Sequence, residues 1–83
     1  MKINYLTWLK KELSLESEEI NLPQTIDTLD SLILFLMRRG EPFATVFGKR
    51  HVIFTEADGQ VIENLHNITE CKEISFFSPI VGG

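Results

Sequence analysis

Polar and apolar residues alternate along three short segments of the chain, which is the pattern of a β-strand with one buried face. The segments are residues 2–6, 18–22 and 72–77. The residues on their apolar sides are Ile3 and Tyr5, Ile20 and Leu22, and Ile74 and Phe76. Pro23 ends the second strand because proline offers no backbone donor to a sheet. The alternation predicts that strands lie at both ends of the chain.

The longest periodic pattern lies between these strands, where apolar residues recur every three or four positions. They are Ile26, Leu29, Leu32, Ile33, Leu36 and Met37. Thr25 is the expected N-cap, and Asp27 and Asp30 lie in the opening turns, where the helix dipole favours negative charge. Gly40 suits a left-handed residue after the helix, and Pro42 prevents continuation. The pattern predicts one amphipathic helix.

Shorter signals complete the series of elements. Residues 8–13 are expected to form a short helical turn, and residues 51–55 a further strand. The sequence Ala57-Asp58-Gly59 predicts a tight turn, followed by a brief edge strand at 61–62. One amphipathic helix among such strands can bury its stripe only against one face of a sheet. We therefore expect an α+β, β-grasp (ubiquitin-like) fold, with a mixed sheet of about five strands and one main helix across one face.

Composition limits the functions that this domain can have. The chain has 83 residues, of which 43% are apolar, and a net charge of −4. This acidic balance argues against nucleic acid as the main partner, because phosphate binding needs a clustered basic surface. Cys71 is the one cysteine, and His51 and His66 lack partners at ligand spacing, so we expect neither a disulfide nor a metal site. No apolar run approaches a membrane span and no signal peptide is evident, which favours a cytoplasmic protein without a membrane partner.

The sequence ends with an unusual segment. A paired aromatic, Phe76-Phe77, is followed by Ser78-Pro79-Ile80-Val81 and then by Gly82-Gly83. Glycines have no Cβ and can enter a narrow site where any side chain would clash. Proline and β-branched residues restrict the backbone, so less entropy is lost when such a segment docks. We therefore divide the chain into a domain, residues 1–77, and an extended tail, residues 78–83, whose terminal carboxylate is the working group.

The element order, the length and this closing segment together resemble the small, sulfur-carrying subunit of molybdopterin synthase (the MoaD type). That family is related to the thiamine-pathway sulfur carrier and is ubiquitin-like. Its members typically carry two successive prolines where this chain has Ser78-Pro79. The resemblance implies a subunit that is not an enzyme on its own and that binds no cofactor. It also implies a heterotetramer with two large subunits.

The resemblance also implies a reaction sequence in molybdenum cofactor biosynthesis. An ATP-dependent adenylating enzyme would join AMP to the Gly83 carboxylate, and a sulfur donor would then displace AMP to leave a thiocarboxylate. The tail, through Pro79, Ile80, Val81 and Gly82, would enter the large synthase subunit. There the sulfur would be transferred to build the dithiolene of molybdopterin. The catalytic lysines and the nucleotide would belong to these partners.

An exposed docking surface is predicted beside the tail. Phe77 alternates with the core positions of the last strand, so it should point to the face that the helix does not cover. Leu6 is out of phase with Ile3 and Tyr5, and Val61 matches a family position on the same face. Three apolar groups on an uncovered face suggest a partner-binding patch. The alternative is a minor second core beneath the loops.

Other functions remain open from the sequence alone. The chain could carry sulfur for thiamine or another pathway, or it could be a ubiquitin-like modifier attached to lysines through Gly83. It could also be a β-grasp binding module with an inert tail. A role for Cys71 as a persulfide carrier is a further, weaker alternative.

Overall fold

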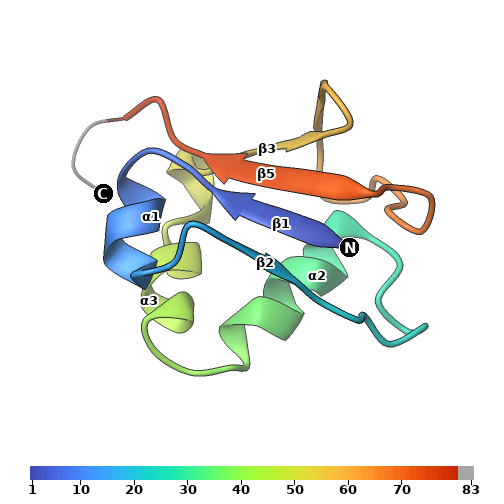
Figure 1. Cartoon of the computed structure of the whole chain (residues 1–83), viewed down its shortest axis with the longest axis horizontal. Helices are drawn as coiled ribbons and strands as arrows, with labels where there is room; N and C mark the ends of the chain where they lie inside the picture. The colour runs from blue at the N-terminus through green and yellow to red at the C-terminus, as the bar shows by residue number, and fades with distance from the viewer. Residues whose placement is uncertain (81–83) are drawn as a thin grey trace.

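In the computed structural model, which describes residues 1–80, five strands form one mixed sheet against which helices pack (Figure 1). The elements in chain order are β1 (Lys2–Tyr5), α1 (Trp8–Leu13), β2 (Ser17–Glu19), α2 (Leu29–Met37), α3 (Phe43–Gly48), the 3-10 helix η1 (Arg50–Val52), β3 (Phe54–Ala57), β4 (Gln60–Ile62) and β5 (Glu73–Phe77). The predicted α+β class is confirmed.

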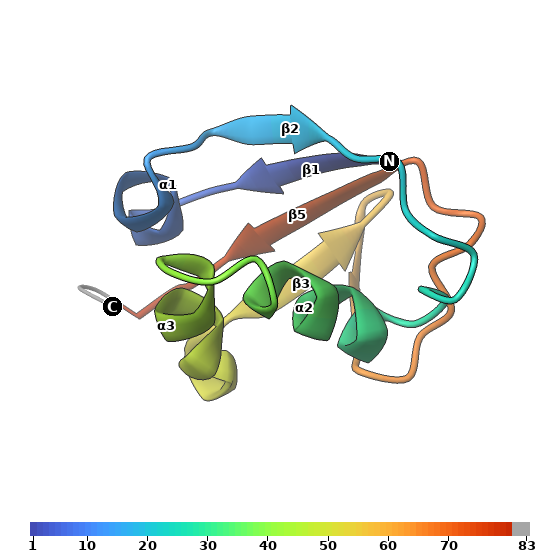
Figure 2. The ribbon, with the colours of Figure 1, turned by 90° about the horizontal axis from the view of Figure 1, so that it is seen from below.

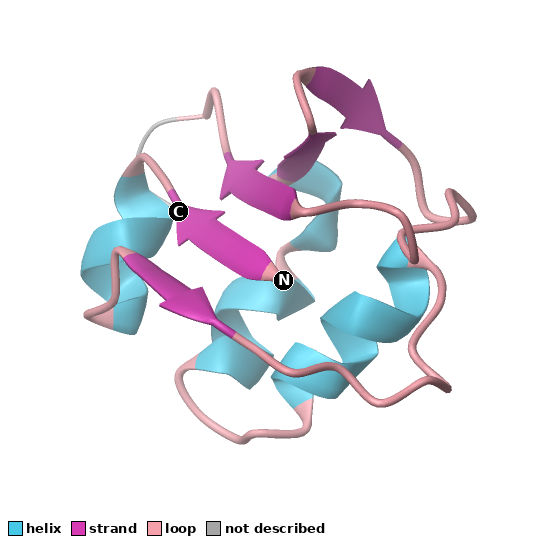
Figure 3. Cartoon of the chain, turned by 45° about the vertical axis from the view of Figure 1, so that its right-hand side comes forward, coloured by secondary structure: helices cyan, strands magenta, loops and turns pink. Residues whose placement is uncertain are grey.

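The order of strands across the sheet is β2-β1-β5-β3-β4, so the last strand of the chain lies at its centre. β1 pairs antiparallel with β2 and parallel with β5, and β5 pairs antiparallel with β3. Helices α2 and α3 lie across one side of the strands (Figures 2 and 3). This mixed sheet, with its main helix across one face, has the predicted β-grasp arrangement.

The hairpin between β3 and β4 forms where the sequence predicts it. Ala57 pairs with Gln60, which leaves Asp58 and Gly59 as the two turn residues. Both have positive φ, at 49° and 91°. A two-residue turn of this kind matches the twist of the flanking strands and requires positive φ at both positions. The turn therefore sets the register of the edge strand β4.

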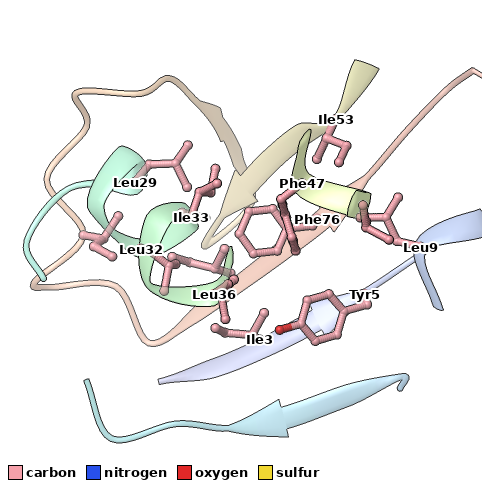
Figure 4. Packing of buried hydrophobic residues seen from close by; sticks show 14 of the residues in the cluster. Ile3, Tyr5, Leu9, Leu29, Leu32, Ile33, Leu36, Phe47, Ile53 and Phe76 are labelled. Atoms are coloured by element: carbon pink, nitrogen blue, oxygen red, sulfur yellow. The ribbon is translucent and has the colours of Figure 1, made fainter. Parts of the chain in front are cut away.

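The hydrophobic core lies between the sheet and the helices (Figure 4). Its centre is aromatic. Phe76 stacks on Tyr5 with ring centroids 6.1 Å apart, and Phe47 meets Phe76 edge-on at 5.0 Å. Such pairs add about 0.5–1.5 kcal/mol beyond the area that they bury. The largest fully buried side chains are those of Tyr5, Phe47, Phe76, Ile3, Leu9, Leu29, Leu32, Leu36, Ile68 and Ile74.

The main helix begins later than the sequence predicts. Its N-cap is Thr28, whose hydroxyl accepts the Ser31 amide at 3.2 Å, while the Ser31 hydroxyl accepts the Thr28 amide at 3.0 Å. The prediction of Thr25 as N-cap was therefore wrong, and Asp27 precedes the helix. The reason is a long-range contact, because the carbonyl of Asp27 accepts the amide of Ile68 at 2.8 Å and fixes the approach to the helix.

The structure differs from the expected elements in three further ways. Helix α3 was not predicted, and it supplies Phe47 to the centre of the core. Strand β3 begins at Phe54 rather than at residue 51, because residues 50–52 form η1. Strand β2 ends at Glu19 rather than at residue 22, since β1, its pairing partner, begins at Lys2. Among residues 1–80, no helix has the length and apolar character needed to cross a membrane.

Candidate functional site

The face of the sheet opposite α2 and α3, here called the open face, carries the residues that alternate with core positions. In β5, Phe77 lies on this face because Ile74 and Phe76 point into the core. In β3, Phe54 lies there because Thr55 and Ala57 are buried. The predicted orientation of Phe77 follows from the same alternation.

Phe54 and Phe77 form the centre of an apolar surface on the open face. They are paired across β3 and β5, and their rings meet edge-on with centroids 5.9 Å apart. Phe54 is 46% exposed, whereas Phe77 is half-buried. Phe77 was predicted to be exposed, but Phe54, which was not predicted to lie on this face, covers part of it. The alternation of β3 would have revealed Phe54 if the strand had been placed at residues 54–57.

Leu6 and Val61 extend this surface on either side. Leu6 is 42% exposed, and its amide donates to the carbonyl of Phe76 at 2.9 Å, which keeps it beside Phe77. Val61 is 64% exposed and pairs with Glu56 across β3 and β4, so it lies diagonally from Phe54. We call Leu6, Phe54, Val61 and Phe77 the open-face patch. Leu6 and Val61 are too exposed to form a minor second core.

An open groove of about 1020 Å³ borders the patch, and Phe54 and Val61 are among the residues that line it. Arg50, His51 and His66 line the groove as well. The Arg50 guanidinium donates to the side-chain carbonyl of Asn64, and burial lowers the pKa of Arg50. Arg50 thus places a cationic group in the lining of the groove beside the patch.

The tail begins in a fixed position, because Ser78 is held by the body of the domain. Ser78 directly follows Phe77 and is only 3% exposed. Its amide donates to the Thr7 hydroxyl at 3.1 Å, and that hydroxyl in turn donates to the carbonyl of Leu6 at 2.6 Å. The start of the predicted tail is therefore attached to the loop between β1 and α1.

Two residues later the chain is held again. The indole N–H of Trp8 donates to the carbonyl of Ile80 at 2.8 Å, and the Ile80 amide donates to the Ser78 hydroxyl at 3.2 Å. Pro79 and Ile80 themselves are exposed. These side-chain bonds hold residues 78–80, the first half of the predicted tail, against the domain.

The remaining candidates are distributed as follows. Val81, Gly82 and Gly83 lie outside the described residues. Cys71 is half-buried, and its pKa is raised by burial and by the charge of Asp58, which lowers its reactivity as a nucleophile. Within residues 1–80, no group of three or more histidine, cysteine or acidic side chains could hold a metal ion.

In comparisons with known proteins, no protein-family model matches the chain and no curated protein is similar to it in sequence.

Proposed function

We propose that this chain is the sulfur-carrying small subunit of a molybdopterin synthase, with Gly83 as the reactive residue. The observation that supports it most directly is the continuity of β5 with the tail. Phe77 belongs to the open-face patch and Ser78 is the first residue of the tail. A partner bound to the patch would lie next to the residue at which the tail begins. This arrangement suits a protein that a partner binds through its folded domain while its terminal carboxylate reacts.

The chemistry would take place at the Gly83 carboxylate. A carboxylate oxygen attacks the α-phosphorus of ATP and pyrophosphate leaves, which gives an acyl-adenylate. A sulfide-level nucleophile then adds to the acyl carbon, and AMP leaves with the bonding electron pair. The resulting thiocarboxylate is a better nucleophile than a carboxylate because sulfur is more polarizable. The adenylating enzyme, the sulfur donor and the large synthase subunit would supply the acid–base groups.

The intact mass of the chain tests the proposal directly. After incubation with ATP, a molybdopterin-pathway adenylating enzyme and sulfide, we expect the mass change for replacement of one oxygen by sulfur, located at Gly83 by fragmentation. Two matched variants are needed. Deletion of Gly83 should abolish the change, and Cys71→Ser should leave it intact. A sulfur added to Cys71, or an unmodified tail with an active enzyme, would contradict the proposal.

The pathway needs a separate experiment, because sulfur carriers of other pathways and ubiquitin-like modifiers would use the same terminal group. We expect the chain to restore molybdoenzyme activity in a strain that lacks its own small subunit. Restoration of thiamine synthesis in place of molybdoenzyme activity would assign the chain to the other carrier class. Formation of isopeptide bonds between Gly83 and lysines would assign it to the modifiers.

A further inference from the structure

Two side chains from the start of α1 hold residues 78–80, the first part of the tail. Thr7 accepts the amide of Ser78, and Trp8 donates its indole N–H to the carbonyl of Ile80. The Ile80 amide is satisfied within the segment by the Ser78 hydroxyl. Pro79 has no amide hydrogen to satisfy. Every backbone N–H from residue 78 to residue 80 therefore has a partner, although Pro79 and Ile80 are exposed to solvent.

Thr7, which makes one of these contacts, has a strained backbone conformation. Thr7 has φ 56° and ψ −138°, a conformation that residues with a Cβ rarely adopt. Glycine would adopt it without strain but has no hydroxyl. The threonine hydroxyl makes two hydrogen bonds here, to the Leu6 carbonyl and from the Ser78 amide. The strain thus accompanies a specific link between the body and the tail.

The Trp8 ring is itself held in place. It is the first residue of α1, is partly buried against the core, and lies under the Lys49 ammonium, 5.5 Å from the ring centroid. Lys49 is the C-cap of α3, so the indole is contacted from the ends of two helices. These contacts position the indole N–H to donate to the carbonyl of Ile80.

We propose that Thr7 and Trp8 form a clasp that sets how much of the tail a partner can use. With the clasp closed, three residues follow Ile80 and span roughly 10 Å when extended. With it open, six residues follow Phe77 and span roughly 20 Å. A partner whose reactive centre is buried needs the longer form, so its binding breaks the bond between Trp8 and Ile80. Trp8 is accordingly a positioning residue. Its use in sulfur transfer rests on the proposed function, whereas the clasp is a property of the isolated chain.

The clasp can be tested without any partner. In the ¹⁵N-labelled full chain, we expect a high heteronuclear NOE at the Ile80 amide and slow exchange of the Trp8 indole N–H. Trp8→Phe retains an aromatic ring but removes the donor, and should lower the NOE at Ile80. Thr7→Ala should lower it as well, while Thr7→Ser retains the hydroxyl and should not. An Ile80 NOE that is equal in all four proteins would overturn the clasp.

Kinetics with the adenylating enzyme then test its role. Trp8→Phe removes one of the hydrogen bonds that opening has to break, so it should lower the KM for the chain by about two- to tenfold with little change in kcat. A higher KM for Trp8→Phe would mean that the partner binds the closed form, which contradicts the proposal. If neither protein is adenylated, the proposed function fails, and the NMR comparison still decides whether the clasp exists.

Discussion

Phe54 and Phe77 face each other across the antiparallel strands β3 and β5, with ring centroids 5.9 Å apart and ring planes at 80°. This pair fixes the apolar centre of the open face immediately before the tail begins at Ser78. Since Phe54 is 46% exposed, the pair leaves apolar surface available to a partner. Its two members should therefore contribute differently to stability and to binding.

On the proposed function, Phe54→Ala should weaken binding to the large synthase subunit. It should lower the free energy of unfolding by about 1 kcal/mol or less, because much of the ring is already in water. Phe77→Ala should also weaken binding but should cost about 1–2 kcal/mol of stability, since that ring is half-buried. Titration calorimetry measures the first quantity and urea unfolding measures the second.

Leu34→Ala is the matched control for this comparison. Leu34 is also 46% exposed, but it lies on α2, away from the open face. Its removal should leave binding unchanged. Equal losses of affinity for Leu34→Ala and Phe54→Ala would show that binding depends on general apolar exposure and would contradict the assignment of the patch.

The sequence predicts those parts of the fold that follow from local rules. Alternation identifies Ile3, Tyr5, Ile74 and Phe76 as core residues, and the turn at Asp58 follows from its conformational preference. These features depend on residues that are close together in the sequence, so the sequence alone is enough to predict them. The face occupied by Phe77 is correct for the same reason.

The features that were missed depend on contacts between distant residues. The Leu29 and Asp30 amides at the start of α2 donate to the carbonyls of His66 and Asn64, and no local signal reveals this. The attachment of Ser78 to Thr7 joins residues 71 positions apart. Helix α3 is an exception, because Phe43, Val46 and Phe47 follow helical spacing and could have been recognised.

The capping residue of α2 gives a prediction with an internal control. Thr28→Ala removes the hydroxyl that accepts the Ser31 amide and should lower the free energy of unfolding by about 1 kcal/mol. Thr28→Ser retains the acceptor and should cost much less. Thr25→Ala should be nearly neutral, since Thr25 is exposed and precedes the helix. Urea unfolding of the three variants measures these effects, and a larger loss for Thr25→Ala would mean that the helix begins earlier in solution.

Stability at acid pH should depend on a network around Glu18. Its carboxylate accepts the Tyr5 hydroxyl at 2.7 Å and receives two hydrogen bonds from Arg39, each at 2.8 Å. The hydrogen bonds from Arg39, with a contribution from Tyr5, lower the pKa of Glu18 below its ordinary value of 4.5. Because the folded-state pKa is the lower one, the stabilisation is complete above the unfolded-state pKa. It is lost as the pH falls through the folded-state pKa.

Glu18→Gln should therefore lower the free energy of unfolding by about 1–2 kcal/mol at pH 7, and this difference from wild type should shrink as the pH falls below about 4. Urea unfolding at a series of pH values gives the comparison. Glu12→Gln is the control, since Glu12 is an exposed carboxylate on α1, and its variant should follow the wild-type curve. A difference between Glu18→Gln and wild type that stays constant across the pH range would show that the ionised carboxylate is not what stabilises the fold.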